Sequence, residues 1–182
     1  MSVFTNSKSG AKVHAFRYTE AVLELLGERD PMQVLREHVP ALKKAIKGLT
    51  ETQLRTRESP RKWSILEVLG HLSDTELVYR YRLRMIVAEP GCNIVGYDQD
   101  AWAKRLRYNE QDPALVMKEI EAMRGATLRW LDSLNDTELA RAGEHDERGE
   151  ESARHVVRMV AGHDLVHRQQ IERIRAVVAP GG

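Results

Sequence analysis

The sequence predicts an all-α fold, a four-helix bundle. Apolar residues recur every three or four positions through four long stretches, the spacing that places them on one face of a helix. Alternation of apolar and polar residues over the length of a strand is hard to find. Helix start signals precede three of the stretches, at residues 30–31, 64–67 and 112–113.

The chain divides into a short N-terminal segment and one bundle domain. Residues 1–17 contain Ser, Lys and Gly without a hydrophobic run, and we expect them to be flexible. Residues 18–179 form a single four-helix bundle domain in this interpretation. A short first helix is expected from Tyr18 to Leu26, because Gly27 ends it.

The first long helix follows at the Asp30-Pro31 pair, with Asp30 as the N-cap and Pro31 in the first turn. It should end near Gly48. Pro40 lies inside it and should kink or split it, because proline has no N–H to donate to the preceding turn.

The second long helix begins at a capping box, in which Ser64 and Glu67 each bond the backbone of the other. Pro90 and Gly91 stop it. The connection 92–111 is long, contains a helical piece over 98–106, and carries Tyr97, Trp102 and Tyr108. These aromatics either cover a pocket or pack over an open end of the bundle.

The third long helix starts at Asp112-Pro113, and its apolar face runs to Leu134. The polar connector 135–149 precedes the last helix, expected over 152–178. Four amphipathic helices with connections of this kind indicate a bundle, although the spacing does not give the order of the helices in space.

Composition limits the classes of function. The 182 residues include 28 basic and 27 acidic residues, net charge +1, which argues against a nucleic-acid-binding surface. The single cysteine, Cys92, excludes an internal disulfide and fits a reducing cytosol. No apolar run is long enough to span a bilayer, so we expect a cytoplasmic protein without a membrane partner.

Two histidines occupy the apolar stripe of the last helix. His163 and His167 lie four residues apart, and with the surrounding apolar residues Val156, Val160, Ile171, Ile174 and Val178 they fall within an arc of about 80°. A polar ring on a core-facing stripe must be hydrogen-bonded or must bind something. The spacing therefore predicts either a metal site or two satisfied core histidines.

A third imidazole is available from the second long helix, where His71 lies on the flank of the stripe. Three imidazole ligands with an open fourth position are typical of a catalytic transition-metal site. The stretch from His163 to His167 also resembles the H-E-x-x-H motif of zinc proteases with Asp164 in place of glutamate. That interpretation is disfavoured, because aspartate is shorter and the chain shows no strand-rich half.

Other polar residues have less specific interpretations. Asp74 and Asp164 are candidates to accept a hydrogen bond from the N–H of a ligand ring and so fix its tautomer, although a solvated carboxylate is the alternative for each. His38 and His145 are flanked by charged residues, and we expect them at the surface. His155 should be exposed or paired with a carboxylate.

Two stretches of the chain together resemble the DinB/YfiT-like family. The first, residues 63–76, begins with Trp63-Ser64 and contains His71-Leu72 and Glu76. The second, residues 162–171, contains His163-Asp164 and His167. The similarity extends over roughly residues 34–174. Proteins of this family are four-helix bundles, often dimers, whose metal is held by one histidine of the second bundle helix and two of the last. The resemblance thus implies that His71, His163 and His167 are the metal ligands.

The resemblance also implies a function. It favours a metal-dependent thiol S-transferase that uses a low-molecular-weight thiol such as bacillithiol or mycothiol, with a metal-dependent hydrolase or a non-enzymatic dimeric bundle as alternatives. The cofactor would be a divalent metal ion, zinc or nickel first, with iron or manganese next. The partners would be a small-molecule substrate and a second copy of the chain.

Overall fold

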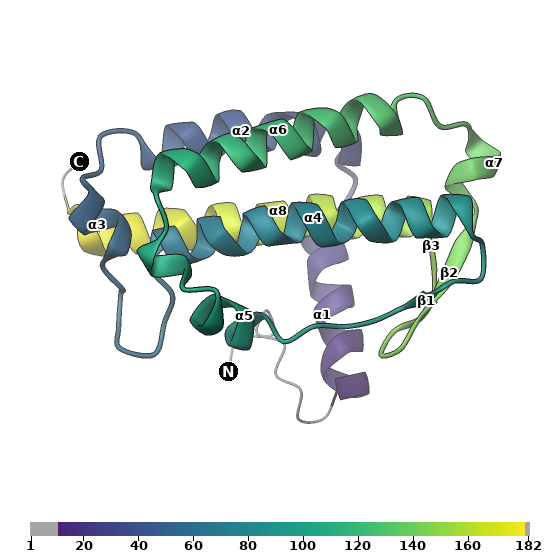
Figure 1. Ribbon diagram of the computed structural model, residues 1–182, viewed down its shortest axis with the longest axis horizontal. Coiled ribbons are helices and arrows are strands. Elements are labelled where there is room, and N and C mark those ends of the chain that lie inside the picture. The colour runs from purple at the N-terminus through teal and green to yellow at the C-terminus, as the bar shows by residue number, and fades with distance from the viewer. Residues whose placement is uncertain (1–10, 181–182) are drawn as a thin grey trace.

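The computed structural model describes residues 11–180, with side chains from residue 17 on (Figure 1). Within this range four long helices form a bundle, which confirms the predicted all-α class: α2 (Pro31–Ile46), α4 (Ile65–Ala88), α6 (Pro113–Leu131) and α8 (Ala153–Val178). The other helical elements are α1 (Ala11–Leu26), α3 (Glu51–Arg55), α5 (Gln99–Arg105), the 3-10 turn η1 (Tyr108–Glu110) and α7 (Asp136–Leu139).

The four long helices form a closed ring in which α2 packs on α8, α8 on α4, α4 on α6, and α6 on α2. The consecutive long helices α2 and α4 are thus at opposite corners of the ring. Helices α4 and α6 run in the same direction, and so do α2 and α8 (Figure 1). This order is not that of a simple up-down bundle, where consecutive helices are antiparallel neighbours.

The predicted helix starts are present as specific hydrogen bonds. The Glu67 amide donates to Ser64 Oγ at 3.1 Å and the Ser64 amide donates to Glu67 Oε2 at 2.8 Å, which completes the capping box. Asp30 and Asp112 each accept a bond from an amide of the following first turn. These local bonds satisfy amides that have no partner within their own helix.

Two helices differ from the expectation. Helix α1 begins at Ala11, so the segment 1–17 expected to be flexible overlaps it over residues 11–17, and residues 1–10 lie outside the described part of the chain. Helix α2 is continuous through Pro40 rather than split there. Pro40 lies on the exposed side of the helix, where water can bond the carbonyl that loses its N–H partner.

Three short strands, β1 (Asn93–Ile94), β2 (Ala142–His145) and β3 (Gly149–Ser152), form a small sheet that the sequence pattern did not predict. Strands β2 and β3 are an antiparallel hairpin, and β1 lies parallel to β2. Strands of two to four residues are too short to show alternation. Backbone hydrogen bonds between segments far apart in the sequence define them instead.

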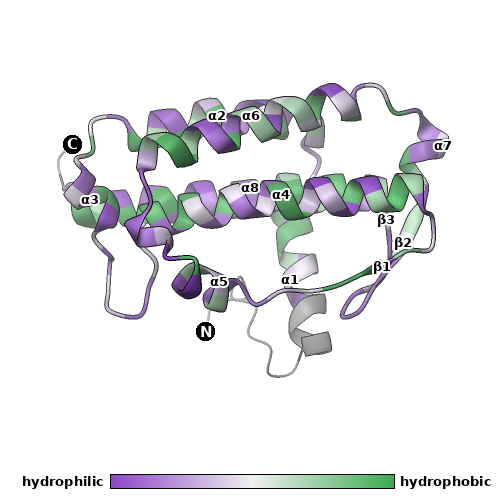
Figure 2. Ribbon diagram, in the orientation of Figure 1, coloured by the Kyte–Doolittle hydropathy of each residue, from purple (hydrophilic) through white to green (hydrophobic). Residues whose placement is uncertain are grey.

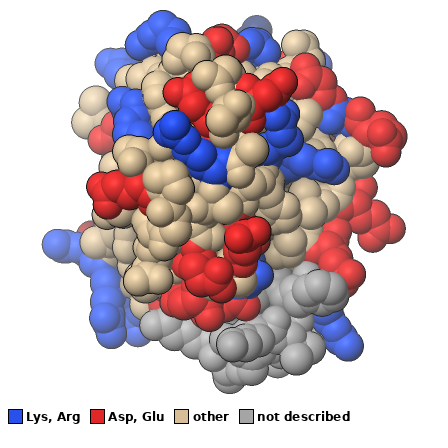
Figure 3. Space-filling model, turned by 90° about the vertical axis from the view of Figure 1, so that its right-hand side faces the viewer, with Lys and Arg blue, Asp and Glu red and all other residues tan. Residues whose placement is uncertain are grey.

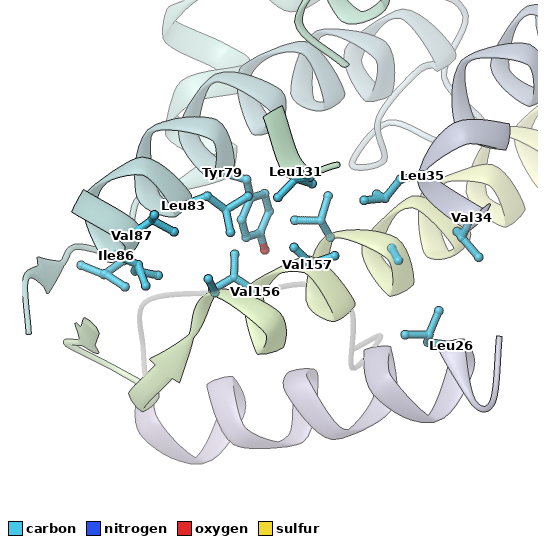
Figure 4. Packing of buried hydrophobic residues seen from close by; sticks show 14 residues of the cluster. Leu26, Val34, Leu35, Tyr79, Leu83, Ile86, Val87, Leu131, Val156 and Val157 are labelled. Carbon is cyan, nitrogen blue, oxygen red and sulfur yellow. The ribbon is translucent and has the colours of Figure 1, made fainter. Parts of the chain in front are cut away.

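The described residues form two large apolar clusters along the bundle and a small third one of Val22, Met159 and Val166. One apolar cluster, drawn in Figure 4, contains residues such as Leu35, Leu83 and Val156. A second contains residues such as Leu42, Leu69 and Ile171, toward the opposite end. A buried polar layer separates the two large clusters along each long helix: His38 on α2, Glu76 on α4, Arg124 on α6, and His163, Asp164 and His167 on α8. His71 adjoins this layer on α4, next to Leu72 of the second cluster.

The surface carries charges of both signs. In Figure 2 hydrophilic and hydrophobic residues interleave along each long helix, as expected for helices with one buried face. Figure 3 shows lysine, arginine and acidic side chains on the same end of the molecule, with neither sign covering it. Among the described residues, no helix has both the length and the apolarity that a bilayer crossing requires.

Candidate metal centre

Three imidazoles converge inside the bundle. Helix α4 contributes His71 and helix α8 contributes His163 and His167, and each side chain is less than a tenth exposed. The Nε2 atom of His163 lies 3.1 Å from Nε2 of His71 and 3.1 Å from Nε2 of His167. The structure thus brings the three sequence-predicted residues together, with one ring nitrogen of each within 4.8 Å of the others.

Hydrogen bonding among the rings does not account for this geometry. Each ring nitrogen carries either one proton or one lone pair, so Nε2 of His163 can be bonded to one of its two neighbours but not to both. One of the 3.1 Å contacts would then have no proton between its nitrogens. Three nitrogens on a tetrahedral zinc ion would lie about 3.3–3.4 Å apart, because Zn–N bonds are about 2.0–2.1 Å long.

A glutamine orients one of the rings. The Nδ1 atom of His167 lies 2.7 Å from Oε1 of Gln170, one turn farther along α8. If Nδ1 carries the proton and donates it to that oxygen, Nε2 presents its lone pair to the other two histidines. The arrangement is that of a ring prepared as a ligand.

Neither predicted carboxylate orients a ring. Asp74 accepts a hydrogen bond from the Tyr108 hydroxyl, and both oxygens of Asp164 face Arg124. Among the described residues, Nδ1 of His71 and Nδ1 of His163 have no hydrogen-bond partner. The engagement of Asp164 also argues against its acting as the base of a zinc-protease motif.

Burial holds the three rings neutral. Removal from water lowers the pKa of His71 and of His163 well below the usual histidine value, and neighbouring histidines lower both further. Burial lowers the pKa of His167 to about 4, although its bond to Gln170 opposes the shift. Neutral imidazole is the form that binds a metal, so the histidine cluster (His71, His163 and His167) is in ligand form at neutral pH.

A buried ionic network lies beside the histidine cluster and was missed by sequence reasoning. Arg124 of α6 donates to Glu76 of α4, to Asp164 of α8 at 2.7 Å, and to the Leu35 carbonyl of α2 at 3.0 Å. One guanidinium therefore contacts all three other long helices. The sequence signal that could have revealed this network is Arg124 itself, which lies one turn after Ile120 on an otherwise apolar helix face.

Two other histidines are not where the sequence predicted. His38 is fully buried, and its Nε2 lies 3.4 Å from Oδ1 of Asp164, because the ring order of the helices turns this face of α2 toward α8. His145 is 1 % exposed rather than solvated, because strand β2 turns its side chain inward. His155 is half-buried, with Nε2 4.0 Å from a Glu151 oxygen, as expected for pairing with a carboxylate.

Two hydroxyl groups approach the histidine cluster. Thr75 Oγ1 lies 3.5 Å from Nε2 of His71 and 3.4 Å from the Tyr97 hydroxyl. Burial raises the pKa of Tyr97 to about 12, so its hydroxyl stays protonated. Of the three aromatics expected to cover a pocket or an open end, Tyr97 lines a cavity of about 50 Å³ beside the cluster and Tyr108 packs on Gly70 of α4.

A larger cavity, about 340 Å³, lies on the other side of the cluster. His167, Gln170 and Trp63 line it, and the Trp63 ring packs on His71 with the two ring centroids 5.1 Å apart. A cavity of this volume is in the range that small-molecule ligands occupy. The histidine cluster therefore has access to a space where a substrate could bind.

Comparison with known proteins gives the family. The sequence profile described as the DinB superfamily matches residues 35–171, which is most of the chain and includes all three histidines. The chain belongs to the DinB superfamily. This confirms the DinB/YfiT-like resemblance carried by residues 63–76 and 162–171.

Individual relatives of this DinB-superfamily chain are bacterial. YfiT from Bacillus subtilis is 27% identical over 114 residues, covering 63% of this chain and 64% of its own length. A relative from Oceanobacillus iheyensis is 28% identical over 126 residues, covering 69% and 73% of the two chains. Both are named as candidate metal-dependent hydrolases.

A solved structure shows the same fold. The structure of YfiT from Bacillus subtilis superposes with a TM-score of 0.75 at 23% sequence identity, over 80% of this chain and 83% of that one. It is described as a probable metal-dependent hydrolase with an unusual four-helix bundle topology. The helices of the present chain follow the ring order α2, α8, α4, α6, which also differs from that of a simple up-down bundle.

Proposed function

We propose that this protein is a metal-dependent hydrolase in which His71, His163 and His167 hold one divalent cation, zinc or nickel in preference to iron or manganese. The observation that carries the proposal is the convergence of three buried Nε2 atoms, at 3.1 Å from the central His163, with no set of ring protons that satisfies both contacts. The hydrolase names of the two relatives described above are consistent with it.

Three neutral ligands suit a catalytic site better than a structural one. A cation bound by them keeps its full charge and an open position, where it would polarise a substrate carbonyl and lower the pKa of water. The substrate would enter from the 340 Å³ cavity beside His167. In hydrolysis, the oxygen of water bonds to the carbonyl carbon, the bond to the leaving group breaks, and the leaving group takes a proton.

Residues of the chain would assist this reaction without touching the cation. Gln170 holds the His167 ring, and the rings of Trp63 and Tyr79 pack beside the histidines and keep bulk water out. The Thr75 hydroxyl lies 3.5 Å from Nε2 of His71 and 3.4 Å from the Tyr97 hydroxyl, so it would lie beside a cation held by the histidine cluster.

Elemental analysis of protein purified without a histidine tag and without added metal tests the assignment. We expect close to one equivalent of a divalent metal per chain, and we expect His163→Ala to remove it. His155→Ala is the matched control, because His155 is on the same helix but outside the histidine cluster. Full metal occupancy in His163→Ala would overturn the proposal.

Thiol S-transfer and dimer formation, both implied by the family resemblance, remain predictions. A screen of the metal-loaded protein against esters and amides, and against thiol plus electrophile pairs, separates the two reaction classes. Hydrolysis in the absence of thiol supports the proposed function, whereas turnover that requires a thiol supports the transferase. Analytical ultracentrifugation tests the homodimer.

A further inference from the structure

A second cavity adjoins the one beside His167, and the two share a wall. The second has a volume of about 360 Å³ and lies between α5, η1 and the loop 56–64. Both cavities are lined by Arg61, Lys62, Trp63 and Asp100. The shared wall therefore extends from the histidine cluster outward to the surface formed by the loop and α5.

Of the two acidic residues that line the first cavity, Glu58 is neutralised by a cationic partner and Asp100, within the described part of the chain, is not. Glu58 receives two hydrogen bonds from Arg173, each 3.0 Å long. Asp100 lies beside the Trp63 side chain, which is uncharged and does not offset the charge of the carboxylate. Glu67, at the edge of the second cavity, is paired with Arg57 and closes the α4 capping box.

The cationic residues of the wall are not neutralised in the same way. Arg61, Lys62, Lys104 and Arg107 line one or both cavities. Over residues 17–180, none of these four has a carboxylate within the 4.0 Å that defines an ion pair. Glu110, exposed at the rim, is a further acidic lining residue. Over the same residues, four cations without a close carboxylate face two carboxylates without a close cation, Asp100 and Glu110, so the wall keeps an excess of positive charge facing a concave space.

Exposed lysines and arginines are common on any protein, and their number alone indicates nothing. Arg61 and Lys62 differ because they line the same cavity as His167, and Lys104 and Arg107 continue the wall into the second cavity. A concave wall of one sign concentrates the electrostatic field and attracts ligands of opposite charge. A divalent cation held by three neutral imidazoles would add to the same positive field.

We propose that this wall binds the carboxylate or phosphate group of an anionic small-molecule substrate, and that Arg61 and Lys62 determine the preference for that charge. The proposal rests on the proposed function, because it places the reacting end of the same molecule beside His167. Arg61 and Lys62 are the central pair, since they line both cavities. Lys104 and Arg107 extend the site for a longer anion.

Binding of simple anions to the full-length protein tests the proposal. The indole N–H of Trp63, which lines both cavities, reports binding by NMR during titration with succinate and, separately, with inorganic phosphate. We expect a saturable shift with at least one of the two anions. The anion that gives it identifies whether the site binds a carboxylate or a phosphate group. Succinamide, which is neutral, should give none, and added salt should weaken the anion binding.

Paired variants locate the site. R61Q/K62M should weaken anion binding about 5- to 30-fold, because the anion loses its ion pairs with two solvent-exposed cationic side chains. K118M/R129Q removes the same two charges from α6, outside both cavities, and should bind as the wild type does. Equal affinity of R61Q/K62M and the control, or no saturable shift with either anion, would overturn the proposal.

The titration is repeated on protein stripped of metal, which separates this proposal from the proposed function. Binding that persists without metal and depends on Arg61 and Lys62 supports the anion site even if no metal is found in the purified protein. The opposite result would be anion binding that is lost when the metal is removed and that is equally strong in metal-loaded wild type and R61Q/K62M. That result would place the anion on the metal ion and would overturn the proposed anion site. Failure of the anion site leaves the measured metal content unchanged.

Discussion

The Gln170 side chain contacts the nitrogen of His167 that faces away from the cluster. Its Oε1 lies 2.7 Å from Nδ1 of His167, whereas Nδ1 of His71 and Nδ1 of His163 have no partner in the part of the chain that the structure describes. An acceptor there holds the ring in place and increases its basicity as a ligand. Its effect on the metal can therefore be measured by removing one amide.

Replacing Gln170 with alanine should weaken metal binding by about 10- to 100-fold, the usual cost of losing such a partner. Competition with a chromogenic chelator measures the affinity. Gln169→Ala is the control, since Gln169 is the neighbouring, exposed residue and lines the cavity without bonding a histidine. Equal affinities of the two variants would show that Gln170 does not support the ligand.

At the scale of helices, close approach between α1 and α8 depends on a residue without a side chain. A Cβ atom built on Gly162 would lie 2.4 Å from the Val22 carbonyl oxygen, which is far inside contact distance. The two helices can pack this closely only because residue 162 is glycine. Helix α1 precedes the range matched by the family profile, so this contact joins an additional helix to the bundle.

Gly162→Ala should lower the free energy of unfolding by about 1–3 kcal/mol, because the new methyl group forces α1 and α8 apart. Urea denaturation followed by circular dichroism measures the change. Gly125→Ala is the matched control within α6, where the nearest atom to the new Cβ would be 3.6 Å away. That variant should be unchanged or more stable by up to about 1 kcal/mol, since alanine favours the helix. A Gly162→Ala protein as stable as Gly125→Ala would contradict this account of the packing.

Across the whole molecule, a polar layer interrupts the apolar core. Arg124 offsets the buried charges of Glu76 and Asp164, while the histidines avoid a charge by staying neutral. Burial also lowers the pKa of His38 well below its usual range, and raises that of Asp164 to about 6. The layer is therefore stable only while its imidazoles remain unprotonated.

Acid should destabilise the metal-free protein. The unfolded chain binds protons at its histidines below about pH 6.5, whereas His167 in the folded protein does not until about pH 4. Burial also lowers the pKa of His38, His71 and His163 well below the usual histidine value, so these rings too resist protonation in the folded protein. Unfolding near pH 5 then takes up roughly two to four protons, after subtracting the opposite contribution of Asp164. The free energy of unfolding should fall steadily from pH 6.5 to pH 4.5.

Urea titrations at several pH values, on protein treated with a chelator, measure this dependence. His71→Gln/His167→Gln removes two of the groups, so its stability should depend less steeply on pH over the same interval. A wild-type protein with constant stability between pH 6.5 and pH 4.5 would contradict the neutral state of the buried histidines.

Much of the fold was predictable because helix signals are local. The Asp30, Ser64 and Asp112 caps bond amides two or three residues away, so sequence order alone reveals them. The placement of His163 and His167 on the buried face of one helix follows from a period of 3.6 residues. Their membership of a metal site with His71 is a prediction that the geometry favours and that elemental analysis will test.

What the sequence alone determined was the four long helices, the class of fold and the buried face on which His163 and His167 lie. Only the tertiary structure decided which helices are neighbours, and with that the burial of His38, the three partners of Arg124 and the wall of Arg61 and Lys62. The reason is physical: periodicity records which side of a helix is apolar, but not which other helix covers it. Contacts between distant segments arise when the whole chain packs at once.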